Sequence, residues 1–301
     1  MTHPAPEFIT LISEPRDDYT LIDSGGGRKY ERYGGKRFIR PEPQAMWAPA
    51  RDDWDADAEF IPGSDDEGGG RWYNNRPVPI DGWPLIWNEE VTFNAQCTPF
   101  RHLGFFPDMD PVWRWMRGQL DGMASPDCMN LFGYTGVGTL ALSAVGAKMV
   151  HVDASKKSVT QARANAVLSG MDDRPVRWIT DDAAKFVARE VRRERRYDGI
   201  LLDPPKYGRG PDGEVWRLEE DLAPLLSNCR LLLDADSRFL FLTVYAVRMS
   251  ALALGGLMQS ICGDLPGHIE FGELAVREEA RGHLLPTAIF ARWSNHNEGQ
   301  S

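Results

Sequence analysis

The chain has 301 residues, of which 42% are hydrophobic and 26% are charged, values that are ordinary for a folded globular protein. Its formal net charge of -10 argues against broad, non-specific attraction to nucleic-acid phosphates, although a local basic face is compatible with it. No apolar run is long enough to cross a bilayer, and the amino terminus lacks a secretory signal pattern, so we expect a cytoplasmic protein that does not contact membranes.

The first part of the chain predicts a small β-rich domain at residues 1–110. Short apolar pieces alternate there with glycine clusters, a pattern typical of hairpins. Residues 52–70 carry acidic side chains and no lysine or arginine, and they end in three glycines, so we expect a solvated acidic loop. A helix within residues 111–127 is expected to link this domain to the remainder of the chain.

From residue 128 onward, short apolar strands alternate with amphipathic helices. Strands are expected at residues 128–132, 149–152, 176–180, 199–202 and 239–243, with two more near 268–274 and 287–293. Helices are expected between most of these strands. The alternation predicts an α/β domain at residues 128–301 with a doubly wound, parallel sheet and right-handed crossovers.

A glycine-rich turn follows the first of these strands. Gly133-Tyr134-Thr135-Gly136-Val137-Gly138 spaces its glycines GxxGxG, unlike the GxGxxG of dinucleotide enzymes, whose middle glycine admits a pyrophosphate. This spacing favours a cofactor without phosphates, such as S-adenosylmethionine, over NAD or ATP.

Aspartates close three consecutive strands of the predicted sheet. Asp153 follows Gly133 by about twenty residues, a position suited to accept hydrogen bonds from ribose hydroxyls. Asp182 is placed to accept from an adenine amino group beside the Ala183 N–H, and Asp203 ends the fourth strand. Each aspartate alone is equally explained as the cap of a following helix. Their common order favours a methyltransferase.

The same segments resemble a known family. NLFGYTGVGTLALSAVGAKMVHVDASKKSVTQARANAVLSG, ITDDAAKF, YDGILLDPPKYG and the earlier RHLGFFPDMD resemble bacterial large-subunit ribosomal RNA methyltransferases of the cytosine-C5 type. The resemblance covers about residues 100–293 and implies a Rossmann-like class I methyltransferase fold, S-adenosylmethionine as cofactor and an RNA substrate. The region before about residue 90 does not resemble the small RNA-binding module of the best-known members.

The candidate cofactor-binding residues come from these motifs. His102 and Phe106 precede the predicted sheet, and either is also compatible with a purely structural role. The complete set is His102, Phe106, Asn130, Phe132, Gly133, Tyr134, Thr135, Gly136, Asp153, Ala154, Asp182, Ala183 and Asp203.

The catalytic cysteine of the resembling enzymes is missing. Enzymes that methylate cytosine carbon-5 first add a thiolate to carbon-6, and the resemblance places that thiol after the fifth strand. Here the run is Thr243-Val244-Tyr245-Ala246, with Tyr245 about where the thiol should be. The chain's four cysteines are far apart, with no metal spacing, and we expect reduced, mostly buried thiols: Cys97, Cys128, Cys229 and Cys262. We therefore expect direct in-line methyl transfer to a nitrogen or oxygen.

The candidate catalytic residues are Asp203, Lys206 and Tyr207. The prolines after Asp203 must stop its strand, which holds the carboxylate at the sheet edge. Asp203 either orients an acceptor amino group or only orders the loop. Lys206 either contacts a substrate phosphate or covers the site with its stem, and Tyr207 either stacks on a base or packs in the core.

Methylation of a protein or small molecule, or cofactor binding without catalysis, are the alternative functions. The sequence predicts no oligomeric state.

Overall fold

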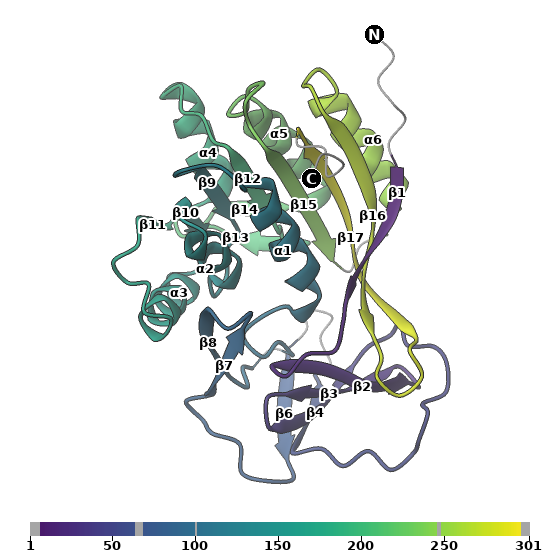
Figure 1. Ribbon diagram of the computed structural model, residues 1–301. Helices are drawn as coiled ribbons and strands as arrows, with labels where there is room; N and C mark the ends of the chain where they lie inside the picture. The colour runs from purple at the N-terminus through teal and green to yellow at the C-terminus, as the bar shows by residue number, and fades with distance from the viewer. Residues whose placement is uncertain (1–6, 64–68, 100, 246–247, 296–301) are drawn as a thin grey trace. The chain divides into compact units, whose positions relative to one another are not determined.

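A computed structural model describes residues 7–63, 69–99, 101–245 and 248–295 (Figure 1). These residues form two compact units. The described part of the α/β unit comprises residues 7–11, 112–273 and 288–295, and the β unit comprises residues 12–111 and 274–287. Each unit is assembled from segments that are far apart in the sequence.

The α/β unit contains an eight-stranded sheet with the order β1-β16-β17-β15-β12-β9-β10-β11. Its strands are β1 (Glu7–Ser13), β9 (Asp127–Leu131), β10 (Lys148–Asp153), β11 (Val176–Thr180), β12 (Gly199–Leu202), β15 (Phe239–Tyr245), β16 (His268–Arg277) and β17 (Leu284–Ser294). The five strands from β11 to β15 are parallel, and β17 pairs antiparallel to β15. The predicted doubly wound α/β sheet is confirmed.

Six helices among the described residues accompany this sheet. They are α1 (Asp110–Gln119), α2 (Val137–Ala144), α3 (Lys156–Leu168), α4 (Ala183–Arg192), α5 (Leu218–Arg230) and α6 (Ala251–Cys262). The helix predicted within residues 111–127 is α1, which ends before Gly122, a residue whose φ of 80° favours glycine. In the described residues, no helix is both long and apolar enough to span a membrane.

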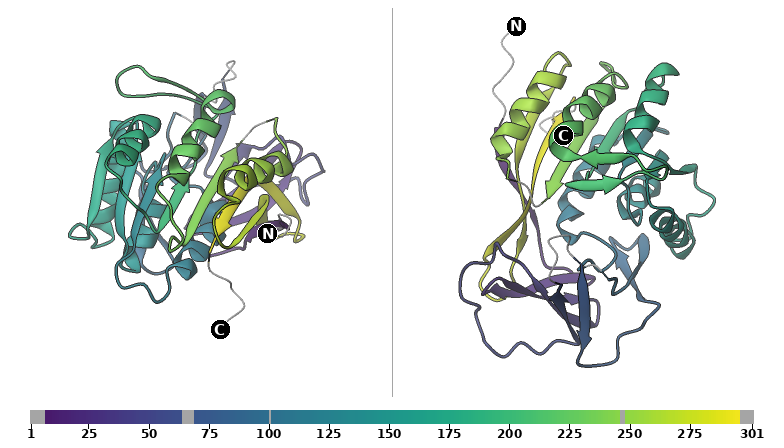
Figure 2. Two further views of the ribbon diagram at one scale, coloured as in Figure 1. Left: turned by 90° about the horizontal axis from the view of Figure 1, so that it is seen from above. Right: turned by 180° about the vertical axis from the view of Figure 1, so that it is seen from behind.

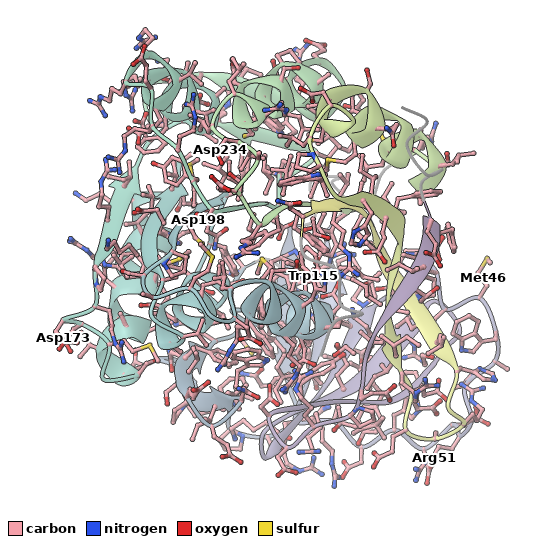
Figure 3. All side chains as sticks on the ribbon, turned by 45° about the horizontal axis from the view of Figure 1, so that its top comes forward. Met46, Arg51, Trp115, Asp173, Asp198 and Asp234 are labelled. Atoms are coloured by element: carbon pink, nitrogen blue, oxygen red, sulfur yellow. The ribbon has the colours of Figure 1, made fainter. Side chains whose placement is uncertain are left out.

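Helices cover both faces of the large sheet (Figure 2). Ile200 and Leu202 of β12 lie in a core cluster with residues of α4, α5 and α6. Leu201, between them, lies against Gly138 of α2 on the other face. On that second face, Trp115 of α1 (labelled in Figure 3) contacts Phe241 of β15, and their ring centroids are 5.6 Å apart. Both faces of the sheet are therefore covered, as a buried parallel sheet requires.

The β unit contains a five-stranded sheet and a separate hairpin. The sheet order is β2 (Tyr19–Gly25), β3 (Arg28–Tyr33), β4 (Lys36–Pro41), β5 (Ala58–Pro62) and β6 (Gly70–Asn74), and the hairpin is β7 (Trp83–Trp87) with β8 (Val91–Ala95). This agrees with a β-rich region but changes two of the expected boundaries.

The expected acidic loop at residues 52–70 is wrong for residues 58–62. These form β5, which pairs with β4 and β6. Ala58 and Phe60 are buried, whereas Glu59 between them points to the other face. The acidic composition of the surrounding residues concealed this short alternation. Asp65, Asp66 and Glu67 lie outside the described residues.

The expected contiguous domain at residues 1–110 also differs from the observed units. Strand β1 pairs with β16 at the edge of the large sheet, so residues 7–11 belong to the α/β unit. Residues 274–287, in turn, belong to the β unit, where the Glu279 and Ala280 N–H groups donate to the Leu21 and Ile22 carbonyls at 2.8 and 3.1 Å.

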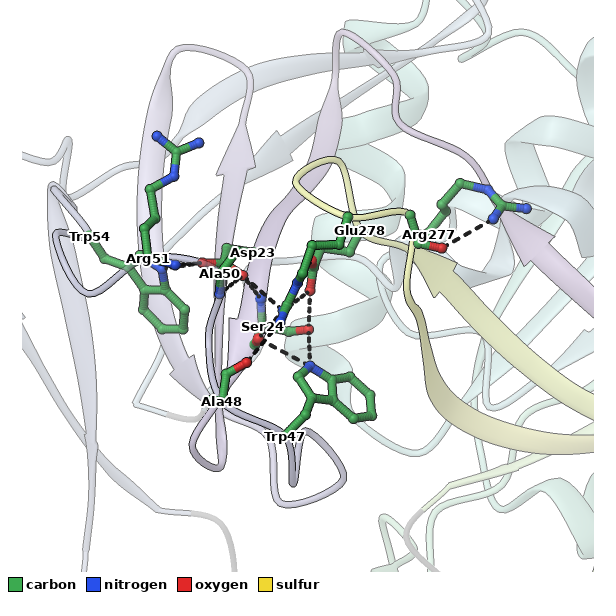
Figure 4. A network of polar contacts seen from close by, with 11 residues as sticks. Asp23, Ser24, Trp47, Ala48, Ala50, Arg51, Trp54, Arg277 and Glu278 are labelled. Carbon is green, nitrogen blue, oxygen red and sulfur yellow. Dashed lines mark hydrogen bonds and ion pairs between the residues drawn. The ribbon is translucent and has the colours of Figure 1, made fainter.

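A buried polar network holds this late segment within the β unit (Figure 4). Asp23 is fully buried and accepts from the Ala50 N–H at 3.0 Å and from the Trp54 indole at 2.8 Å. Arg281 forms ion pairs with Asp23 at 3.1 Å and with Glu278 at 2.7 Å. Because these charges are paired and hydrogen-bonded, their burial is tolerated.

Candidate cofactor and substrate site

The carboxyl ends of three adjacent strands meet at one edge of the large sheet. In the register, Leu131 of β9 pairs with Val152 of β10 and with Leu202 of β12. The chain passes from β9 to β10 and β11 on one side, and later to β12 and β15 on the other. Open α/β sheets bind ligands where the strand order reverses in this way. The structure therefore brings the glycine turn, Asp153 and Asp203 to a single edge.

The glycine turn has a strained backbone. Phe132 and Tyr134 have φ values of 58° and 48°, in a region that L side chains rarely adopt. Gly136, with φ of 82°, is the residue before α2, and its N–H donates to the Gly133 carbonyl at 3.0 Å. Such strain persists only where surrounding contacts hold it, and it concentrates at ligand sites. The sequence pattern gave no sign of the two strained aromatic residues.

Asp153 connects the glycine turn to its own loop. Its carboxylate accepts from the Tyr134 N–H at 2.9 Å and from the Ser155 N–H at 2.8 Å. The cap of α3 is Ser155, whose hydroxyl accepts from the Ser158 N–H at 3.2 Å, so Asp153 does not cap this helix. Burial raises the pKa of Asp153, and the two N–H donors oppose that shift. Each carboxylate oxygen keeps capacity to accept a second hydrogen bond, and Ala154 follows directly in the same loop.

Asp182 does cap a helix. Its carboxylate accepts from the Lys185 N–H at 2.9 Å at the start of α4, of which Ala183 is the first residue. The neighbouring Asp181 N–H donates to the Asp153 carbonyl at 3.1 Å, which joins the ends of β10 and β11. The capping alternative for Asp182 is therefore real, and its contact with adenine remains a prediction.

Asn130 and Thr135 have roles inside the protein. The Asn130 amide is buried and donates to the Thr139 hydroxyl at 2.9 Å. Thr135 is buried too, and its carbonyl accepts from the Asn165 amide at 2.9 Å. These hydrogen bonds connect the strand before the turn to α2 and the turn itself to α3. A direct contact of either residue with the cofactor remains a prediction.

His102 and Phe106 belong to the β unit. Their rings lie 4.8 Å apart between centroids, at 49°. Burial, with the positive charges of Arg40 and Arg101, lowers the pKa of His102 to about 3. Their predicted contact with the cofactor stays a prediction.

The DPPK segment leads into a short hairpin. After Asp203, β13 (Tyr207–Arg209) pairs antiparallel with β14 (Val215–Arg217). The Trp216 indole donates to the Pro205 carbonyl at 2.7 Å, and its ring lies 5.1 Å from that of Phe132. The hairpin is thereby fixed beside the glycine turn. The sequence predicted a loop here because three-residue strands leave no periodicity to detect.

Two cations of this segment form no ion pair with the residues that the structure describes. Lys185 pairs with Glu214, and Arg217 pairs with Glu220 at 3.2 Å. Lys206 and Arg209 are exposed, and no acidic group of the described residues lies within ion-pair distance of either. Tyr207, between them, is 51% exposed, so its ring is not part of the core.

The cysteines do not supply a reactive thiol at this edge. Cys128 lies near the amino end of β9, and Cys229 and Cys262 lie in α5 and α6. Burial raises the pKa of Cys262 and Cys97 to about 12 and raises the pKa of the other two as well. For Cys97 the charges of Arg40 and Lys36 act in the opposite direction, which its sequence neighbours did not reveal.

Tyr245 occupies the end of β15, where the resemblance places the thiol. Its backbone pairs with Ala288 of β17. Ala246, the next residue of that run, lies outside the described residues.

The site residues fit S-adenosylmethionine. A half-buried carboxylate with spare acceptor capacity beside a strained glycine turn suits a neutral ribose, and the turn has no lysine to hold a phosphate. Asp153 and the backbone of residues 132–136 would hold the cofactor.

Comparison with known proteins gives the same result. The family model described as S-adenosylmethionine-dependent methyltransferase matches residues 65–233. A solved S-adenosylmethionine-dependent methyltransferase from Agrobacterium tumefaciens is 40% identical, with a TM-score of 0.92 over 98% of this chain and 97% of that chain.

Two curated relatives match shorter segments. Ribosomal RNA large subunit methyltransferase I of Aeromonas salmonicida is 34% identical over 34% of this chain and 23% of its own length. Ribosomal RNA large subunit methyltransferase K/L of Magnetococcus marinus is 27% identical over 53% of this chain and 22% of its own length. The chain thus spans about a quarter of the length of these relatives. The family match, covering more than half of the chain, together with the sheet-edge geometry, shows that this protein belongs to the S-adenosylmethionine-dependent methyltransferases, with S-adenosylmethionine as its cofactor.

Proposed function

We propose that the protein transfers the methyl group of S-adenosylmethionine to RNA of the large ribosomal subunit, by in-line displacement without a cysteine nucleophile. The names of the curated relatives support this substrate class. The observation that carries the proposal is the pair of exposed cations, Lys206 and Arg209, on either side of the exposed Tyr207; neither is ion-paired within the described part of the chain. Such a substrate would place the protein in the cytoplasm.

Asp203 orients the acceptor in this proposal. When bound, the cofactor supplies an electrophilic methyl group on sulfur. The Asp203 carboxylate, or the Pro204 carbonyl, accepts a hydrogen bond from an amino group of the substrate and turns the nitrogen lone pair toward that methyl group. Nitrogen forms the new bond to carbon, and sulfur keeps the electron pair of the bond that breaks. The surplus proton leaves through Asp203 to water. Orientation of this kind can supply roughly 7–11 kcal/mol of the barrier.

The hairpin would hold the RNA on both sides of the acceptor base. Enzymes that modify bases generally remove the target from its stack. Tyr207 would provide a stacking face, worth roughly 1–3 kcal/mol per base. Lys206 and Arg209 would contact flanking phosphates and release counterions on binding.

Salt dependence of RNA binding tests this arrangement. Lys206→Ala and Arg209→Ala are each expected to weaken binding of unmodified large-subunit ribosomal RNA and to reduce the salt slope by about 1. Tyr207→Ala is expected to weaken binding with the slope unchanged, because stacking releases no counterions. Filter binding across a series of potassium chloride concentrations provides the measurement.

Arg196→Ala is the matched control for charge. Arg196 lies in the connection from α4 to the amino end of β12, the opposite edge of the sheet, and it should leave both affinity and slope unchanged. Identical, salt-independent behaviour of the Lys206 and Tyr207 variants would count against RNA held by this hairpin. It would favour the alternative that the net charge of -10 suggests, methylation of a protein or small molecule.

Activity is also expected to survive without any cysteine. A variant with Cys97, Cys128, Cys229 and Cys262 all changed to alanine should retain turnover, because thiols whose pKa values are raised by burial or partial burial contain little thiolate. Methyl transfer from tritiated cofactor provides the measurement, and calorimetric binding of S-adenosylhomocysteine verifies that the variant is folded. Loss of turnover when one cysteine alone is replaced, with cofactor binding intact, would restore a covalent mechanism.

A further inference from the structure

Gly133 touches the ring of a buried histidine directly beneath the glycine turn. A Cβ atom placed on Gly133 would lie 2.5 Å from both Cε1 and Nδ1 of His151, closer than real atoms approach. The backbone of Gly133 itself is not in the left-handed region that favours glycine. A methyl group at this position would therefore force the turn or the His151 ring to shift, and the obstacle is the ring and not the backbone conformation.

The His151 ring is held in one orientation. Its Nδ1 lies 2.9 Å from the Thr139 hydroxyl, which accepts from the Asn130 amide at 2.9 Å. The Thr139 hydroxyl therefore connects the imidazole to the Asn130 amide of the neighbouring strand β9, which fixes the plane of the ring. His151 is fully buried, and burial lowers its pKa to about 4, so the ring is neutral at physiological pH. The Trp178 ring packs beside it, 5.0 Å away between centroids.

The glycine turn next to this ring contains the two residues with positive φ, and it contacts Asp153, the residue expected to bind the ribose. The Gly133 N–H donates to the Val152 carbonyl at 3.0 Å, and the Tyr134 N–H donates to Asp153 at 2.9 Å. Positive φ values at Phe132 and Tyr134 are retained only if these contacts over-determine the backbone. A flat ring pressed against Gly133 is one of the contacts that do so.

We propose that His151 is a positioning residue for the cofactor. Its ring packs against the backbone of residues 132–134 and thereby fixes the positions of the Tyr134 N–H and of the Asp153 carboxylate. Gly133 is glycine because this packing contact leaves no room for a methyl group. The inference rests on cofactor binding and is independent of the nature of the substrate.

Calorimetry with S-adenosylhomocysteine as the probe tests whether the His151–Gly133 contact affects cofactor affinity. His151→Ala is expected to raise the Kd by on the order of tenfold, as is Gly133→Ala. The double variant Gly133→Ala/His151→Ala should bind no more weakly than Gly133→Ala alone, because the smaller side chain removes the collision. Residues in direct contact show this kind of non-additivity.

Met149→Ala is the matched control. Met149 is buried, lies on the same face of β10 as His151, and is at the other end of the strand from the turn. It should lower the melting temperature at least as much as His151→Ala does, with an unchanged Kd. If His151→Ala does not fold, Gly133→Ala still tests the His151–Gly133 contact, because this substitution removes no buried atom.

Two results would overturn the proposal. One is an unchanged Kd in His151→Ala or Gly133→Ala at a temperature where the variant is folded, which would leave His151 as core packing only. The other is a double variant whose loss equals the sum of the single losses. Failure of the wild-type protein to bind the probe would contradict the cofactor site itself, and this inference with it.

Discussion

Replacing Asp153 by alanine is expected to weaken binding of S-adenosylmethionine by about 1.5–3 kcal/mol, the contribution of hydrogen bonds to a charged group. The substitution removes the acceptor for the ribose hydroxyls. It also leaves the Tyr134 and Ser155 N–H groups without the carboxylate that holds the turn. Isothermal titration calorimetry should show the Kd rising by roughly ten- to 150-fold.

Asp173→Ala is the control for the Asp153 variant. Asp173 is an exposed aspartate in the connection from α3 to β11 (Figure 3), and its loss should leave the Kd unchanged. Burial raises the pKa of Asp153, so its carboxylate becomes protonated at a higher pH than an ordinary aspartate. As the pH is lowered, cofactor affinity should therefore begin to fall at that higher pH. An unchanged affinity in Asp153→Ala would remove Asp153 from the ribose site.

Replacing Arg40 by alanine is expected to lower the free energy of unfolding of the β unit by about 3–5 kcal/mol, because it removes the cation that is hydrogen-bonded to the buried Glu31 carboxylate and leaves only Lys29, 3.8 Å away. Glu31 is fully buried, and both of its carboxylate oxygens lie 2.7 Å from the Arg40 guanidinium. The Tyr19 hydroxyl donates to the same carboxylate at 2.9 Å. Urea denaturation followed by tryptophan fluorescence should show the loss.

Arg37→Ala provides the comparison on the same strand. Arg37 is half exposed and lies 4.0 Å from Asp55, so its loss should cost about 0–1 kcal/mol. Although burial alone would raise the pKa of Glu31, the charges of Arg40 and Lys29 lower it overall. The stabilisation from this carboxylate is therefore present above its ordinary pKa and is lost as the pH falls through the lowered value. Equal effects of the Arg40 and Arg37 substitutions would contradict this account.

The parallel strands of the α/β unit could be predicted because they are short apolar runs, of which β10, β11 and β12 end at or are followed by a polar residue. Pro204 and Pro205 end β12, and Asp153 is the last residue of β10. Parallel strands share one carboxyl edge, so aspartates at their ends could be expected to come together. The candidate site was in this respect readable from residue order alone.

Other features depend on contacts that residue order does not record. The pairing of β1 with β16 joins opposite ends of the chain, and β5 is too short and too acidic to show an apolar period. The role of Asp153 as a bridge, and of Ser155 as the cap, follows from hydrogen-bond geometry. His151 is a single histidine within an apolar strand, and only its contact with Gly133 gives it a role.

The most direct test of the proposed function is to incubate the protein with tritiated S-adenosylmethionine and unmodified large-subunit ribosomal RNA made by transcription, alongside a cell extract freed of nucleic acid. We expect tritium to enter the RNA, to be released by nuclease digestion and to resist protease. Asp203→Ala should abolish most of the labelling even at S-adenosylmethionine concentrations that saturate the variant. Label that enters the protein or small-molecule fraction of the extract, with none in the RNA, would contradict the proposed substrate.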